Sequence, residues 1–163
     1  MKTVTISGHR PEKINDPAWI RAQIRWVLEG TLLANHLIQG MAPGVDIWSA
    51  EIARQIGLLY TCARPWAGHK PRKDNVKGYE DAIYFADKVV VVNPAVNYPG
   101  AWVYQKRNEW MVDHGDVLLA VWDGSSGGTS NCVEYAEKKS RPIYRIDEKQ
   151  KKWGWYANGP VQV

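Results

Sequence analysis

Cysteine and phenylalanine are scarce in this sequence. Its 163 residues include two cysteines and one phenylalanine. Cys62 and Cys132 show neither C-x-x-C spacing nor a matching histidine cluster, so a disulfide framework and a zinc site are not expected. No pattern indicates another metal or an organic cofactor, and we expect none.

Long hydrophobic runs are also missing. The first residues, MKTVTISGHRP, lack the apolar segment of a secretory signal, and no stretch approaches the roughly 20 apolar residues that cross a bilayer. We therefore expect a cytoplasmic protein with no membrane partner. No Pro-rich or Ser-rich linker divides the chain, which predicts one domain over residues 1–146 and a tail, 147–163, whose fold the pattern does not predict.

Charge of one sign is only in small excess. The formal net charge is +4, and five Lys or Arg residues stand against one Asp between Arg64 and Lys77. Such a local excess suits a phosphate-bearing small molecule better than a stripe that follows a nucleic acid, so nucleic acid is not the expected partner. The Pro, Gly and Lys content of this segment predicts an exposed loop or flap, and a charge run is also typical of a solvated surface.

Tryptophan, by contrast, is abundant. The chain contains nine Trp residues. Tryptophans of this number can form a core and the subunit interface of a homo-oligomer, or they can form aromatic walls for a base or a sugar. Composition alone does not separate these interpretations.

The stretch from Asp116 to Lys139 has the strongest local pattern. Residues 117–122 are continuously apolar, as expected for a parallel strand that is covered on both faces. Residues 123–129 then supply three glycines with interleaved hydroxyls, and a helical pattern follows from Ser130. Free N–H groups and the positive end of the helix dipole meet at such a loop, which predicts an anion site. An ordinary strand-to-helix turn with a Ser/Thr cap is the alternative.

Strands and helices alternate along the rest of the chain. This alternation predicts a three-layer α/β domain with a mainly parallel sheet flanked by helices. Gly57 and Gly115 are expected to end their helices as caps, and residues 88–92, with four consecutive valines at 89–92, are expected to be a buried strand. We expect strands at 2–6, 36–39, 58–63, 88–92, 117–122 and 141–146, and helices at 16–30, 47–56, 101–114 and 130–139, with a further helix closing at 81–86.

Two more loops follow predicted strands. In the first, Arg10 could clamp a phosphate and His9 could bond to a ribose or a base, although each is also a common structural residue. In the second, glycines permit close backbone approach, and Asp46 could accept a ribose hydroxyl or simply cap the following helix. Glu51 lies just over one helical turn beyond Asp46. The two carboxylates could share one face of the helix, or Glu51 could be a solvated surface residue.

Four stretches together resemble a known family. They are SGHRP at 7–11, GMAPGVDIWSAE at 40–51, QKRNEWMVDHGDVLLAVWDG at 105–124 and GGTSNCVEYA at 127–136. In order and spacing they resemble the YoqJ and YpsA group of phage and bacterial proteins in the SLOG superfamily, which includes the Lonely Guy phosphoribohydrolases and DprA. The resemblance implies a Rossmann-like fold and a nucleotide, or a ligand derived from one, over the strand ends.

The resemblance also bears on catalysis. Lonely Guy enzymes carry P-G-G-x-G-T-x-x-E, whose Glu acts with an Arg to which Arg107 corresponds. In this chain Cys132 stands at the position of that Glu, and Glu134 lies two residues further along the helix, rotated by about half the circle. Asp46, Glu51 or Asp123 could replace the missing acid.

Three hypotheses follow. The first is binding of a nucleotide or nucleotide-derived signal, the second is hydrolysis of the N-glycosidic bond of a nucleoside 5′-monophosphate, and the third is DNA binding in the manner of DprA. Asp46, Glu51 and Arg107 would be catalytic only in an enzyme. The predicted ligand-binding residues are Ser7, Gly8, His9, Arg10, Gly40, Met41, Gly44, Val45, Asp46, Arg107, Asn108, Asp123, Gly124, Ser126, Gly127, Gly128, Thr129 and Asn131.

Overall fold

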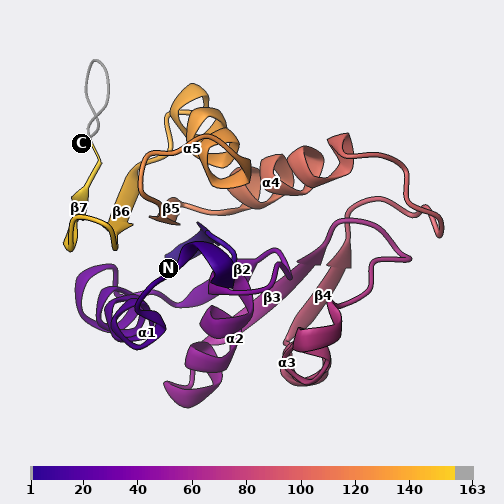
Figure 1. Ribbon diagram of the computed structural model, residues 1–163, viewed down its shortest axis with the longest axis horizontal. Coiled ribbons are helices and arrows are strands. Elements are labelled where there is room, and N and C mark those ends of the chain that lie inside the picture. Colours follow the sequence, from indigo (N-terminus) through magenta and orange to yellow (C-terminus); the bar gives the residue numbers. More distant parts are fainter. Residues whose placement is uncertain (1, 157–163) are drawn as a thin grey trace.

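Seven strands form one sheet in the computed structural model of the protein, which describes residues 2–156 (Figure 1). The strand order is β4-β3-β2-β1-β5-β6-β7. All neighbouring strands are parallel except β6 and β7, which are antiparallel. The strands are β1 (Thr3–Gly8), β2 (His36–Gln39), β3 (Leu59–Arg64), β4 (Lys88–Val91), β5 (Val117–Val121), β6 (Ile143–Asp147) and β7 (Lys152–Trp155).

Helices cover both faces of this sheet. The first three helices lie on one face and α4 and α5 lie on the other, so the predicted three-layer α/β architecture with a mainly parallel sheet is confirmed (Figure 1). The helices are α1 (Pro17–Trp26), which continues into a π-helical turn (Val27–Thr31), α2 (Val45–Gln55), α3 (Val76–Phe85), α4 (Trp102–His114) and α5 (Gly128–Lys138).

Strand β5 is buried on both faces, as its continuous apolar run predicts. Val117, Leu119 and Val121 belong to the core that α1 and α2 share with the sheet. Leu118 and Ala120 point the other way, into a second core beneath α4 and α5. The strand is hydrogen-bonded to β1 on one side and to β6 on the other, so both its faces and both its edges are covered.

The local helix signals are also found in the structure. Asp16 is the N-cap of α1, and its carboxylate accepts the backbone N–H of Trp19 at 3.1 Å, with Pro17 as the first helical residue. Gly57 follows α2 with φ +71°, a left-handed conformation that favours glycine. Helices α3 and α5 include residues ahead of their predicted segments and begin at Val76 and Gly128.

The structure corrects one expectation and adds detail at two other places. The prediction that β4 is buried is wrong, because β4 is an edge strand in which Val89 and Val91 are 39% and 40% exposed. Gly115 ends α4 as its C-cap, as expected, in an extended rather than a left-handed conformation (φ −107°). Part of the tail forms β7, which pairs with β6, while residues 157–163 lie outside the described part of the chain. Within residues 2–156, no helix combines the length and apolar character that crossing a membrane requires.

Gly115 is required for packing, and this can be tested. A Cβ atom at Gly115 would overlap Thr5 Oγ1, which donates a hydrogen bond to the Met111 carbonyl at 2.6 Å. Gly115→Ala should therefore destabilise the protein by about 1–3 kcal/mol, as overpacking does. Gly30→Ala is the matched control, because no heavy atom lies within 4 Å of its added Cβ. Equal urea-unfolding midpoints for the two variants would contradict the packing explanation.

Candidate functional site

A cavity lies at the carboxyl ends of the parallel strands. It has a volume of about 380 Å³ and is enclosed by the loops after β1, β2 and β5, by the first turn of α5 and by one face of α4. Strands β1 and β5 are neighbours, yet the chain continues from β1 to β2 on the opposite side. This reversal of strand order leaves a crevice where ligands bind in open α/β sheets.

Many predicted site residues meet at this cavity although they are far apart in sequence. Those that line it are Ser7, Gly8, His9, Arg10, Asp46, Arg107, Asn108, Ser126, Gly127, Gly128 and Thr129.

The first turn of α5 forms one wall. Gly127 precedes the helix with φ 141° and ψ −162°, a conformation that other residues rarely adopt. A glycine offers no side-chain acceptor to the helix, so the first N–H groups of α5 stay available to a ligand. Asn108 on α4 donates through Nδ2 to the Gly128 carbonyl at 3.3 Å, which ties the loop to the neighbouring helix.

A buried charged cluster forms the floor. The Arg107 guanidinium donates to the Gly40 carbonyl and, through Nε, to Asn108 Oδ1 at 3.3 Å. Asp46 Oδ2 accepts the N–H groups of Gly40 and Ala42, each at 3.2 Å. Arg107 and Asp46 are 7% and 4% exposed, so both charges are removed from water. The turn after β2 is therefore held from both sides.

Burial controls the ionisation of this cluster. It raises the pKa of Asp46 to about 6, against the opposing effects of the Arg107 charge and the two N–H donors. Burial likewise lowers the pKa of Arg107, against the opposing effect of the Asp46 charge. Asp46 therefore titrates close to neutral pH.

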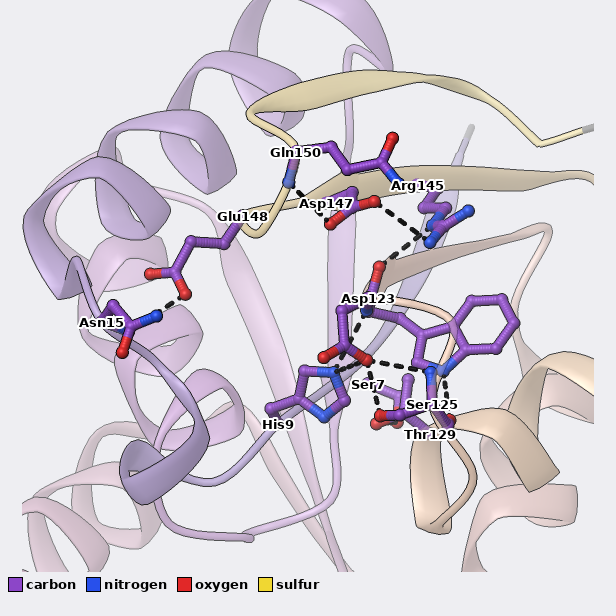
Figure 2. Close-up of polar contacts among 11 residues, drawn as sticks. Ser7, His9, Asn15, Asp123, Ser125, Thr129, Arg145, Asp147, Glu148 and Gln150 are labelled. Atoms are coloured by element: carbon purple, nitrogen blue, oxygen red, sulfur yellow. Dashed lines mark hydrogen bonds and ion pairs between the residues drawn. The ribbon is translucent and has the colours of Figure 1, made fainter.

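His9 and Asp123 join the loops after β1 and β5. Figure 2 shows the Asp123 carboxylate directed toward the His9 ring and toward Ser125. His9 Nε2 lies 3.1 Å from Asp123 Oδ1 and 3.2 Å from the Asp123 backbone nitrogen, so it donates to the carboxylate in one tautomer and accepts the N–H in the other. Desolvation raises the pKa of Asp123, but hydrogen bonds from the Ser125 hydroxyl and N–H, together with the neighbouring His9 ring, outweigh it and lower the pKa to about 2. Asp123 is thus an ionised group that fixes the loop, and it lines a smaller cavity of about 160 Å³ beside the main one.

Several predicted glycines and apolar residues support the cavity from behind. A Cβ at Gly8 would lie 2.6 Å from Val45, and a Cβ at Gly40 would lie 2.8 Å from the Arg107 side chain. Gly44 has φ +90° and lies against the His9 carbonyl. Met41 has φ +68° and lines a neighbouring cavity. These positions shape the site through contacts within the protein.

The other predicted residues point elsewhere. Glu51 forms an ion pair with Arg21 at 2.7 Å and is not among the cavity-lining residues. Gly124 lies near the Arg145 guanidinium, with φ +94°, and Asn131 is exposed on α5.

Some lining residues were not predicted. Tyr104 lies three and four residues before Arg107 and Asn108 on α4, so helical spacing could have placed it on the same face. Lys13 belongs to a short 3-10 turn after Arg10, a structure that gives no clear sequence signal. The unpredicted lining residues are Glu12, Lys13, Ala42, Tyr104, Ser125 and Ser130.

Cys132 is an inert core residue. It is fully buried, and burial raises the pKa of its thiol to about 12. In residues 2–156, no group of three or more His, Cys, Asp or Glu side chains is arranged to hold a metal ion.

The family of the chain follows from its sequence. The model of the YpsA family, described as the YspA SLOG family, matches residues 6–150. The chain belongs to this SLOG family. It is 38% identical over 74 residues to the SPbeta prophage-derived protein YoqJ of Bacillus subtilis. That alignment covers 40% of this chain and 43% of YoqJ.

Solved structures share the fold of this SLOG domain. DNA processing protein A (DprA) of Streptococcus pneumoniae superposes with a TM-score of 0.70 at 16% identity, over 90% of this chain and 50% of DprA. The chain thus spans half the length of that protein. The molybdenum cofactor binding protein of Rippkaea orientalis superposes with a TM-score of 0.59 at 20% identity, over 90% of this chain and 76% of that one. At these identities the likeness establishes the Rossmann-like SLOG fold.

The raised pKa of Asp46 predicts a specific pH dependence of stability. Its carboxyl binds a proton more tightly in the folded state than at its ordinary pKa of 3.8, so its contribution to stability is complete below about pH 4 and is lost as pH rises through about 6. Asp46→Asn removes this titration. As pH rises from 4 to 7.5, the unfolding free energy of wild type should fall relative to that of the variant by up to about 3 kcal/mol, in addition to the pH-independent cost of the substitution.

Urea unfolding at several pH values measures this difference. Asp81→Asn is the matched control, because Asp81 forms an ion pair with the exposed Lys77 and its loss should cost little. A difference between wild type and Asp46→Asn that stays constant with pH would contradict the expected titration.

Proposed function

We propose that this chain binds a nucleotide, or a small molecule derived from one, with a phosphate group at the first turn of α5. The observation that carries the proposal is the cavity itself. The glycine-rich turn 125–130 lines it and leads into helix α5, and the cavity lies where the strand order of the sheet reverses. Backbone N–H groups and the positive end of a helix dipole bind phosphate there without further specialised chemistry.

The charges around the cavity support this proposal. Arg10 and Lys13 are exposed and line the same cavity from the loop after β1. A phosphate at the α5 turn would share this cavity with backbone N–H donors and these two cations, an arrangement that favours charge-assisted hydrogen bonds.

The basic segment favours a small ligand over DNA, because much of its charge is used within the fold. Arg72 forms ion pairs with Glu12 and Asp74, and Lys77 pairs with Asp81. Arg64 donates to backbone carbonyls of its own loop. The Rippkaea orientalis relative is described as a molybdenum cofactor binding protein, which supports a ligand-binding role for this fold.

The arrangement favours binding over hydrolysis of a glycosidic bond. Cys132 has no acid function, and Glu51 is engaged by Arg21. Asp46 lines the cavity, but both of its N–H contacts hold it in the turn after β2. A carboxylate whose oxygen is used in this way is a poor general acid for a bound sugar.

The first test places a negative charge where the phosphate should bind. Gly128 has no heavy atom within 4 Å of an added Cβ, so Gly128→Asp should fold normally, and an acid in the first turn of a helix is favourable. We expect calorimetry with AMP, GMP, CMP and UMP to show at least a tenfold loss of affinity for whichever nucleotide binds wild type. Gly128→Asn, which has the same shape without the charge, should bind within a few-fold of wild type. If Gly128→Asp binds the nucleotide as tightly as wild type does, the phosphate does not bind at this turn.

The second test concerns catalysis. Excess protein incubated with each nucleoside monophosphate in a single turnover should release no free base on the time scale of binding, because a competent general acid or base contributes about a hundredfold or more in rate. Chromatography of the products measures this. Rapid stoichiometric base release that disappears in Asp46→Asn would instead establish the hydrolase.

A further inference from the structure

A second cavity adjoins the first. It also has a volume of about 380 Å³, and it lies over the loops after β2 and β3. Arg10 and Tyr104 line both cavities, so the two spaces are adjacent and share a wall. A ligand that occupies the first cavity can therefore extend into the second by passing these two side chains.

Aromatic rings form the wall of the second cavity. Trp66 is 8% exposed and contacts His69 and Tyr104 edge to face, with ring centroids 4.8 and 5.7 Å apart. The ring of Tyr98 lies 5.3 Å from that of Trp66. Rings held in this way offer a planar heterocycle a preformed aromatic surface at little entropic cost.

The loop that carries this wall is fixed by hydrogen bonds. Arg64 Nη2 donates to the carbonyls of Ala67 and His69 at 3.0 and 2.8 Å. The hydroxyl of Tyr79 lies 2.8 Å from His69 Nδ1. Burial, followed by the charges of Arg107, Arg64 and Arg10, lowers the pKa of His69 to about 4, so its ring is neutral at physiological pH. The cavity is thus a preformed, largely uncharged aromatic surface with cations at its rim.

One polar group of this cavity has no partner in the protein. Asn75 lines the cavity, and its Nδ2 atom is buried without a hydrogen-bond partner among the described residues. Asn75 stands at the N-cap position of α3, yet its side chain makes no capping bond. A buried donor without an acceptor is costly, so such a group indicates a missing acceptor. The ring nitrogens and carbonyls of a nucleobase are acceptors of this kind.

We infer that the second cavity holds the heterocyclic base of the ligand, stacked against Trp66 and Tyr104 and hydrogen-bonded by Asn75, while the phosphate lies in the first cavity. This inference rests on the proposed function, and it assigns Arg10 and Tyr104 to the sugar and the link between base and phosphate. The ligand class is then a nucleotide whose base is recognised, and ribose 5-phosphate alone would fill only the first cavity.

The test compares AMP, GMP, CMP and UMP with ribose 5-phosphate by calorimetry. At least one nucleotide should bind wild type tenfold or more tightly than ribose 5-phosphate. Asn75→Leu should weaken that nucleotide about fivefold, within the range for loss of one neutral hydrogen bond, and leave ribose 5-phosphate unchanged. Its unfolding midpoint should not fall, because Asn75 Nδ2 has no hydrogen-bond partner among the described residues and the side chain makes no capping bond. Asn97→Leu, at an exposed position, is the matched control and should bind both ligands as wild type does.

Tryptophan fluorescence gives a second readout. The nucleotide, but not ribose 5-phosphate, should change the emission of wild type, and Trp66→Phe should lack most of this change. If ribose 5-phosphate binds as tightly as every nucleotide, or if Asn75→Leu weakens both ligands equally, the base does not occupy the second cavity, while the phosphate site stands. If no nucleotide and no ribose 5-phosphate binds wild type, the proposed function fails, and this inference fails with it.

Discussion

The contact between Arg107 and the Gly40 carbonyl joins the two halves of the site. Helix α4 carries the arginine, and the turn after β2 carries the carbonyl, so one buried guanidinium connects the layer of α4 and α5 with the side of the sheet that leads to α2. Asp46 holds the same turn from within through two N–H groups. Neither charge is exposed to water, and each favours the ionised form of the other. Loss of either partner would leave a buried charge uncompensated, which is among the most costly changes a core can suffer.

Glycines make this arrangement possible in two different ways. Gly8 and Gly40 leave room for protein side chains, Val45 and Arg107, that would otherwise collide with a Cβ atom. Gly127 and Gly128, by contrast, have no heavy atom within 4 Å of an added Cβ, so the surface there is open. The glycines of these three loops thus divide into positions that the protein itself fills and positions where the surface stays open.

The same separation applies to charge and aromatic residues. Arg64 and Arg72 lie in the basic segment, but their guanidinium groups are used to fix the loop after β3 and to bind acidic neighbours. Trp66 lies in the same segment and is buried against other rings. The basic segment is therefore an ordered part of the fold. Its net charge is a weaker guide to ligand binding than the polar groups in it that have no partner within the described residues.

Local sequence determined the succession of strands and helices along the chain, the burial of β5 and the glycine turn before α5. Apolar periodicity, caps and glycine conformations act over a few residues, so these features can be predicted locally. It also indicated that the loops after β1, β2 and β5, which line the cavity, would lie together, since the ends of parallel strands meet at one edge of a sheet. Tertiary structure decided the rest. The apolar run of β4 reads like that of an interior strand, and only the strand order makes it an edge. The partner of Glu51 is Arg21 on another helix, and the charge that opposes the rise in the pKa of Asp46 comes from Arg107, which lies far along the chain. Tyr104, Trp66 and Asn75 meet around one cavity through contacts between distant segments, which no local pattern encodes.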